Sequence, residues 1–230
     1  MGTLTGKSLE LAKIFEKRKV NIACVQETRN RVGILVDNDL RAIVVEVRRV
    51  NDRLLTIKLV VGGFTLNIIS VYAPQAELDE EVKMSFWADL DEMVWGTPYT
   101  EKVLIGGDFN GHIVATSGRY DVVRVGFGFG ETEEEPNSSF PKKREHLVTF
   151  RSSVAETQID YVLCRKYNRG LCTNCKVIPS ENLSTLHRLL VMEFEITRKR
   201  AIYSQHRIKW GALMEAKAQE LGVKLVTMGA

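Results

Sequence analysis

The stretch VLIGGDFNGHIV, which runs from Val103 to Val114, decides the fold class of this sequence. Its apolar start stops at two glycines, and an aspartate, an asparagine and a histidine follow within five residues. Such a pattern is typical of a short buried strand whose end is marked by glycine. Polar groups at the end of a buried strand face the crevice where ligands bind in α/β proteins. The stretch alone is equally compatible with an Asp/Asn-rich turn whose side chains bond to their own backbone.

Outside this stretch, the spacing of apolar residues predicts two amphipathic helices and several strands. The helices are expected around residues 9–15 and over residues 79–95. The strands are expected in the segments VNIACVQE, GILV, AIVVEVRRV, LLTIKLVV, FTLNIISVY, LVTFRS, TQIDYVLC, CKVIP and HRLLVMEFEI. Residues 115–141 are rich in glycine and acidic side chains, so we expect an irregular loop there.

The composition is that of an ordinary globular protein, with 44% hydrophobic and 27% charged residues in a chain of 230. The formal net charge of +3 neither requires nor excludes a nucleic-acid partner. No apolar run approaches the roughly eighteen residues of a membrane span, so we expect no membrane partner. The four cysteines predict reduced thiols in a soluble intracellular protein. Cys172 and Cys175 have the spacing of half a zinc site, but no second pair exists, which favours two free thiols.

Polar side chains of the kinds used in phosphate chemistry follow or interrupt the expected strands. In sequence order they are Glu27, Tyr72, Asp108, Asn110, Asp160 and His187. Carboxylates without a thiolate suit a hard cation, so this set implies Mg²⁺ or Mn²⁺. Such an ion can polarise a phosphoryl group while a nearby carboxylate orients the attacking water. The residues therefore predict hydrolysis of a phosphate ester.

The blocks CVQET, VYAP, GGDFNGHI, QIDYVL and HRLLV occur in this order. Together they resemble the endonuclease/exonuclease/phosphatase superfamily. The chain is most similar within it to the apurinic-type endonuclease domain of RTE-type LINE (non-LTR) retrotransposons and to domesticated relatives of that domain. The resemblance implies an α/β fold, a four-layer α/β sandwich of two packed mixed β-sheets flanked by helices. It also implies one or two Mg²⁺ or Mn²⁺ ions, DNA as the substrate and no nucleotide cofactor.

The same resemblance implies a role for each candidate residue. Glu27 would ligate the metal, and Asp160 would lie near the metal or the leaving oxygen, as a metal ligand or a catalytic group. Asp108 and Asn110 would position and activate the attacking water.

Two further residues, Tyr72 and His187, would bond to the phosphate by the same resemblance. Weaker candidates for contacts with nucleic acid are a possible stacking residue and a basic group, namely Phe150, Lys142, Lys143 and Arg144. Core packing is an equally good interpretation of Phe150.

The sequence also departs from the family pattern. It begins after the position of the family's first strand, which carries an active-site asparagine, and residues 115–141 replace an expected helix and strand. We therefore expect a sandwich truncated at its first strand and in its middle. Leu186 stands before His187 where relatives have aspartate or glutamine, and leucine cannot accept a hydrogen bond from the imidazole.

The expected organisation is an endonuclease/exonuclease/phosphatase-like domain over residues 1–197. A basic segment and a helix over 198–230 would follow as the remnant of a linker. Three functions remain open: a metal-dependent DNA-nicking endonuclease, a non-catalytic remnant that binds nucleic acid or a protein, and a phosphatase for a small ester. The first is the leading hypothesis, with activity reduced by the departures. The basic cluster after residue 197 leaves a nuclear location open, and the oligomeric state is not indicated.

Overall fold

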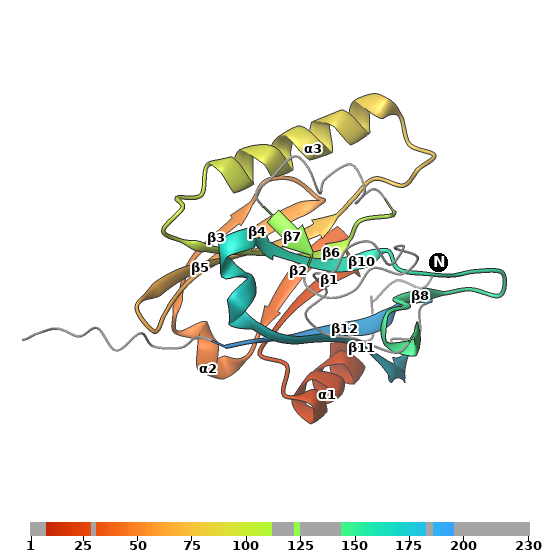
Figure 1. The fold of residues 1–230 in the computed structure, drawn as a ribbon, viewed down its shortest axis with the longest axis horizontal. Coiled ribbons are helices and arrows are strands. Elements are labelled where there is room, and N and C mark those ends of the chain that lie inside the picture. Colours follow the sequence, from red (N-terminus) through yellow and green to blue (C-terminus); the bar gives the residue numbers. More distant parts are fainter. Residues whose placement is uncertain (1–7, 29–30, 112–121, 125–143, 183–185, 196–230) are drawn as a thin grey trace, which may run out of the picture. The chain divides into compact units, whose positions relative to one another are not determined.

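The computed structural model describes residues 8–28, 31–111, 122–124, 144–182 and 186–195 (Figure 1). The helices are α1 (Ser8–Arg18), α2 (Asn38–Arg41) and α3 (Glu80–Trp95), with the short 3₁₀ helices η2 (Arg144–His146) and η3 (Lys166–Leu171). The strands of the first half are β1 (Ile22–Thr28), β2 (Arg31–Val36), β3 (Val44–Arg49), β4 (Leu54–Val61), β5 (Phe64–Tyr72) and β6 (Lys102–Asp108). The second half adds β7 (Val122–Arg124), β8 (Phe150–Arg151), β9 (Glu156–Thr157), β10 (Asp160–Arg165), β11 (Cys172–Asn182) and β12 (Arg188–Phe194).

Six strands form a central mixed sheet in the order β3-β4-β5-β6-β10-β7. Strands β5 and β6 run parallel, connected through α3, and the other neighbours are antiparallel. Gly62 and Gly63 both have positive φ, at 58° and 85°, which lets them make the tight turn between β4 and β5. β4 and β5, both expected as strands, pair antiparallel along their whole length and form a hairpin at these glycines.

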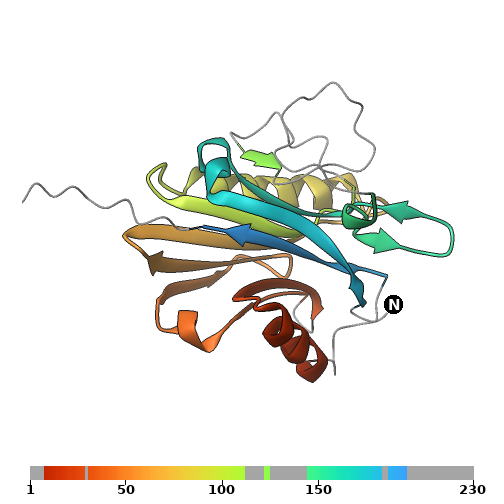
Figure 2. The same ribbon diagram turned by 60° about the horizontal axis from the view of Figure 1, so that its bottom comes forward.

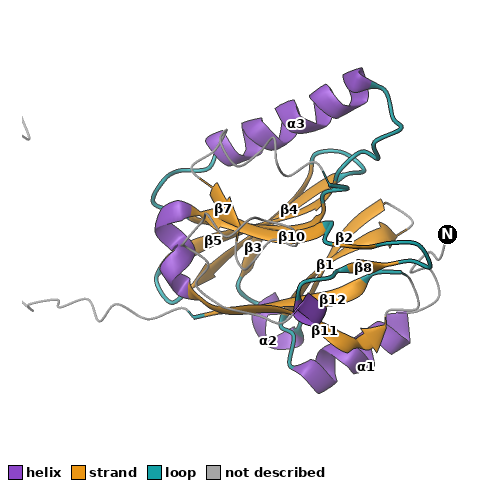
Figure 3. Cartoon of the chain, turned by 45° about the vertical axis from the view of Figure 1, so that its right-hand side comes forward, coloured by secondary structure: helices purple, strands orange, loops and turns teal. Residues whose placement is uncertain are grey.

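The two faces of this sheet support separate cores because successive side chains of a strand alternate between faces. One face packs against α3, where Phe86, Leu90 and Met93 meet Ile69 and Ile105 of the sheet. The other face is covered by two strand pairs, β1–β2 and β11–β12, with α1 on their outer side (Figures 1 and 3). The layers are therefore helix, sheet, strand pairs and helix, which confirms the expected α/β sandwich.

The second strand layer is not one continuous sheet. β1 pairs with β2, and β11 pairs with β12, but the described residues contain no pairing between the two hairpins. Figure 2 shows β12 and the β1–β2 pair as separate ribbons against the central sheet. This interruption fits the expected truncation at a first strand.

Two local expectations need correction. Within the segment expected to be irregular, Val122–Arg124 forms strand β7, because its two valines can pair with the edge of β10. The expected strand LVTFRS is reduced to the two residues of β8, which pair with the short β9 and form one isolated bridge between Phe150 and His187. The other residues of 115–141 and all of 198–230 lie outside the described part, so the domain boundaries stay predictions. No helix among the described residues is long and apolar enough to cross a membrane.

Candidate active site

Three neighbouring strands of the central sheet bring three predicted site residues to the same level. Tyr72 of β5 is the register partner of Asp108 of β6, and Asp108 is the partner of Asp160 of β10. Directly paired residues point to the same side of a sheet. The side chains of Leu104 and Val162, which share this alternation, pack on the face covered by the two hairpins. The three polar groups therefore project toward the hairpin layer.

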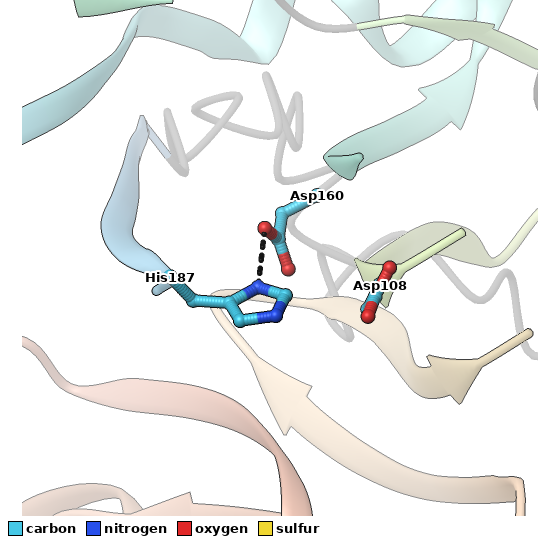
Figure 4. Close-up of side chains that lie close together, drawn as sticks. All are labelled: Asp108, Asp160 and His187. Atoms are coloured by element: carbon cyan, nitrogen blue, oxygen red, sulfur yellow. Dashed lines mark hydrogen bonds and ion pairs between the residues drawn. The ribbon is translucent and has the colours of Figure 1, made fainter. Parts of the chain in front are cut away.

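His187, which lies immediately before β12, completes this group. Its Nδ1 lies 3.0 Å from Oδ2 of Asp160. Asp108, Asp160 and His187 each offer a ligand atom, and these atoms lie within 4.8 Å of one another. Figure 4 shows the three side chains pointing toward a common space. Sequence positions almost eighty residues apart thus form one cluster, which we call the carboxylate–histidine cluster.

The contact between Asp160 and His187 changes the interpretation of Leu186. The sequence suggested that His187 lacks an orienting carboxylate because residue 186 is leucine. The leucine side chain is 52% exposed, and Asp160 supplies the acceptor for the imidazole instead. An aspartate partner fixes the tautomer and the orientation of the ring. The expectation of a poorly oriented His187 is therefore wrong for the described structure.

Asp108 also serves the turn that follows it. Its Oδ1 accepts a hydrogen bond from the backbone N–H of Asn110 at 2.8 Å, and Asn110 has a positive φ of 47°. The amide of Asn110 donates to the carbonyl of Ala73 at 2.7 Å. Both interpretations of residues 106–111 therefore apply: the segment is an Asp/Asn turn, and it presents the carboxylate of Asp108 to a polar cluster.

The surroundings of Gly107 explain why the second of the two glycines in this stretch is a glycine. A Cβ at Gly107 would lie 2.0 Å from the carbonyl oxygen of Val71 and 2.9 Å from the amide nitrogen of Gln26. Its φ of +151° is also one that other residues rarely adopt. Glycine therefore lets β5 and β1 close in on β6 immediately before Asp108.

Thr149 is a positioning residue that the sequence did not reveal. It is fully buried, and its Oγ1 accepts hydrogen bonds from the backbone N–H groups of Ile159 and Asp160, each at 3.0 Å. Its carbonyl accepts from the N–H of Arg188 at 2.8 Å. One residue thus ties the chain at Asp160 to the chain at His187. A lone threonine before an aromatic residue gives no sequence signal for this role.

Of the remaining candidate residues, two have described side-chain contacts and the others do not. The Tyr72 ring lies under the guanidinium of Arg53, with 5.5 Å between the guanidinium carbon and the ring centroid. The Phe150 ring packs edge-on against His187, with 5.2 Å between centroids. Glu27 lies on β1, but its side chain is outside the described atoms. The same holds for the side chain of Arg144, and Lys142 and Lys143 lie outside the described residues altogether.

The donor set of the cluster fits the metal expected from the sequence. Two carboxylates and one imidazole nitrogen are close enough to share one ion. Carboxylate oxygens are the preferred ligands of Mg²⁺ and Mn²⁺, and a site with few protein ligands keeps positions for phosphate oxygens. Cys172 and Cys175 are buried thiols that belong to no metal-binding group among the described residues.

The comparison with solved structures identifies the fold. The endonuclease domain of TRAS1, a telomere-specific non-LTR retrotransposon, superposes with a TM-score of 0.59 at 17% identity, covering 83% of this chain and 93% of that one. The chain has the endonuclease/exonuclease/phosphatase fold. The 3′ phosphatase NExo from Neisseria, solved with a product DNA hairpin, shares this fold with a TM-score of 0.53 at 13% identity. That match covers 84% of this chain and 96% of the other.

The sequence of this endonuclease/exonuclease/phosphatase-fold chain also has a curated relative. Craniofacial development protein 2 of Bos taurus is 26% identical over 195 residues, covering 76% of this chain. The match covers 33% of the relative, so the chain corresponds to about a third of that protein. No protein-family model matches the sequence.

Proposed function

We propose that this chain is a divalent-metal-dependent phosphodiesterase domain that nicks DNA and descends from a retrotransposon endonuclease. The observation that carries the proposal is the carboxylate–histidine cluster at one end of the central sheet. The fold supports it, because a retrotransposon endonuclease and a phosphatase solved with DNA share that fold. The order of the sequence blocks supports the descent.

The chemistry assigned to each residue follows from its surroundings. Asp108 is 4% exposed, and its carboxylate accepts a proton from the attacking water as the new P–O bond forms and the bond to the leaving sugar oxygen breaks. The leaving oxygen takes up a proton from solvent water, and Asp108 later releases its proton to solvent. Asn110 shapes the turn that holds Asp108. His187 has its Nδ1 beside Asp160, and in its protonated form it donates a hydrogen bond from Nε2 to a non-bridging phosphate oxygen, where negative charge increases.

Asp108 and Asp160 would hold the cation, and Glu27 and Tyr72 are proposed to add a metal ligand and a phosphate contact. When bound, the cation polarises the phosphoryl group. Phe150 would border the DNA beside His187. Contacts from Lys142, Lys143 and Arg144 to the phosphate backbone remain a proposal from the sequence, as does a nuclear location.

The test is nicking of supercoiled plasmid and of an oligonucleotide with an abasic site, in Mg²⁺, in Mn²⁺ and in EDTA. Asp108→Asn keeps the acceptor for the N–H of Asn110 but removes the charge, and we expect it to lower the nicking rate by about 10²-fold to 10³-fold. Asp39→Asn is the matched control, because Asp39 is an exposed carboxylate on α2.

Absence of nicking in every metal, with Asp108→Asn indistinguishable from the unaltered chain, would overturn the proposal. Salt-sensitive DNA binding without nicking would then favour the non-catalytic alternative.

A further inference from the structure

Strand β3 forms one edge of the central sheet, and most of its side chains are exposed. It pairs with β4 on one side, and no described strand lies on its other side. Every residue of β3 after Val44 is exposed, and the side chains of Val45 and Val47 are 60% and 66% exposed. The outer side of an edge strand is a template for pairing with another strand. An edge that also exposes valines therefore has two reasons to bind one.

The register with β4 shows which side chains share a face of this edge. Glu46 and Arg48 pair with Lys58 and Thr56, and Val47 pairs with Ile57 on the opposite face. The Glu46 carboxylate lies 3.7 Å from the ammonium group of Lys58. Arg48 has no ion pair or side-chain hydrogen bond within the described part of the chain. One face of the edge thus carries a carboxylate and a guanidinium on either side of Val47.

Arg49 is not part of this charged pair. Its guanidinium is directed toward its own chain, where it donates to the carbonyl of Val32 at 2.9 Å. At the other end, a bulge separates Val44 from the regular register that begins at Glu46. The part of β3 suited to pairing is therefore residues 45–49.

The charges of this segment are complementary to those of a second, antiparallel copy of itself. In a symmetric antiparallel pair the two-fold axis passes through one residue, because opposed residues must have the same hydrogen-bonding role. With the axis at Val47, Glu46 of each copy lies opposite Arg48 of the other. An axis at Glu46 would oppose two carboxylates, and an axis at Arg48 would oppose two guanidinium groups. Like charges directly opposed are destabilising, so the charges select the register centred on Val47.

We propose that β3 pairs with β3 of a second copy of this chain, antiparallel and centred on Val47. The pair joins the two central sheets edge to edge and places the two Val47 side chains against each other. Each Glu46 then lies between its own Lys58 and Arg48 of the other copy. The occupant of the edge is a second copy because the segment is complementary to itself in charge.

The contact lies away from the carboxylate–histidine cluster. β4 and β5 separate β3 from β6 in the sheet. β3 runs in the same direction as β5 and β6, because β4 is antiparallel to both β3 and β5. The ends of the two sheets that carry Asp108 therefore point in opposite directions in the dimer. The dimer leaves each cluster open and does not depend on the proposed function.

The size of the contact sets its strength. Residues 45–49 span about 17 Å as an extended strand, which is a short pairing. Interfaces that bury less than about 1,200 Å² in total are typical of weak, transient pairs. We therefore expect a dimer that dissociates on dilution, with a Kd of about 10–100 μM.

The first experiment is sedimentation velocity of the full chain from about 5 to about 300 μM, which spans the expected Kd. The sedimentation coefficient should rise from that of a monomer toward that of a dimer. Val47→Lys opposes two ammonium groups at the axis and should weaken the dimer by about tenfold or more. Val154→Lys is the matched control, because Val154 is 92% exposed and lies between β8 and β9, and it should change nothing.

Charge reversal tests the register itself. Glu46→Arg opposes arginine to arginine, and Arg48→Glu opposes glutamate to glutamate, so each variant alone should be monomeric. In an equal mixture of the two variants, every opposed pair is an arginine with a glutamate, and the dimer should return. Circular dichroism confirms that both variants are folded. A mixture that stays monomeric, with both variants folded, would overturn the proposal.

Amide hydrogen exchange of the unaltered chain gives a readout that needs no variant. Exchange in a peptide covering 44–49 should slow by about threefold or more between the lowest and the highest concentration. A chain that is monomeric at every concentration would overturn the proposal, and so would a dimer that Val47→Lys leaves unchanged. None of these measurements uses DNA cleavage, so their failure is distinguishable from a failure of the proposed function.

Discussion

Asp160, and not residue 186, is the partner of the His187 imidazole, and this role can be tested. Asp160→Asn keeps the side-chain shape but removes the charged acceptor at 3.0 Å from His187 Nδ1. We expect the nicking rate to fall by about 10²-fold, because an asparagine can favour the wrong tautomer. Leu186→Asp should change the rate little, since His187 already has a carboxylate partner. The measurement is the single-turnover rate on abasic DNA. A large gain in rate from Leu186→Asp would contradict the assigned partner.

Cys24 gives a second prediction at this scale, on pH. Burial raises the pKa of its thiol to about 12. A folded-state pKa above the ordinary 9.0 means that the neutral thiol stabilises the fold below pH 9 and that this contribution is lost as the pH rises toward about 12. Cys24→Ala should therefore flatten the loss of stability in that range. The measurement compares urea midpoints of the two proteins from pH 8 to 11, with iodoacetamide labelling as a second readout.

An unchanged pH profile in Cys24→Ala would contradict this assignment. Rapid labelling of Cys24 at neutral pH in the folded chain would contradict it as well, because the thiolate is the reactive form.

At the scale of elements, Arg165 of β10 holds the end of α3 in place. Its guanidinium is buried and donates to the carbonyls of Val94 and Pro98, each at 2.8 Å. Arg165→Met keeps the length of the side chain but leaves these carbonyls without their donor. We expect a loss of about 3 kcal/mol in the free energy of unfolding, measured by urea denaturation.

The control for this prediction is Arg151→Met. The Arg151 side chain is 62% exposed and pairs with Glu156 at 2.9 Å, so its removal should cost about 0.5 kcal/mol or less. Equal losses from the two variants would show that the buried guanidinium does not stabilise the end of the helix.

The elements themselves were largely predictable, and their pairing was not. Runs of apolar residues predict β4, β5, β6 and β10, and the structure confirms them. The cluster arises because β10 pairs antiparallel with β6, which sets Asp160 beside Asp108. Such long-range register leaves no periodic trace in the sequence. The partner of His187 was missed for this reason, since the sequence shows only the neighbour at residue 186.

At the scale of the whole molecule, the central sheet and the interrupted second strand layer hold different residues of the site. The central sheet and α3 form a full core, and the site residues Asp108 and Asp160 come from this sheet. The missing pairing affects the β1–β2 hairpin, which carries Glu27, and the β11–β12 hairpin, in which His187 lies just before β12. The scaffold of the two aspartates therefore does not depend on the interrupted second strand layer, whereas the position of the ligand expected on β1 does.

This division predicts how the folded chain responds to a divalent cation. A cation that binds the folded state alone stabilises it by about 1.4 kcal/mol at ten times its Kd, which raises the unfolding midpoint by about 3–5 °C. We expect this rise on adding millimolar Mg²⁺ or Mn²⁺ after EDTA treatment, because Asp108 and Asp160 lie close enough to share one ion. Asp108→Asn should abolish it, and sodium chloride of equal ionic strength should not reproduce it. A rise of the same size in Asp108→Asn would place the cation elsewhere, and no rise in the unaltered chain would mean that the two aspartates need the β1 ligand before they can hold a metal.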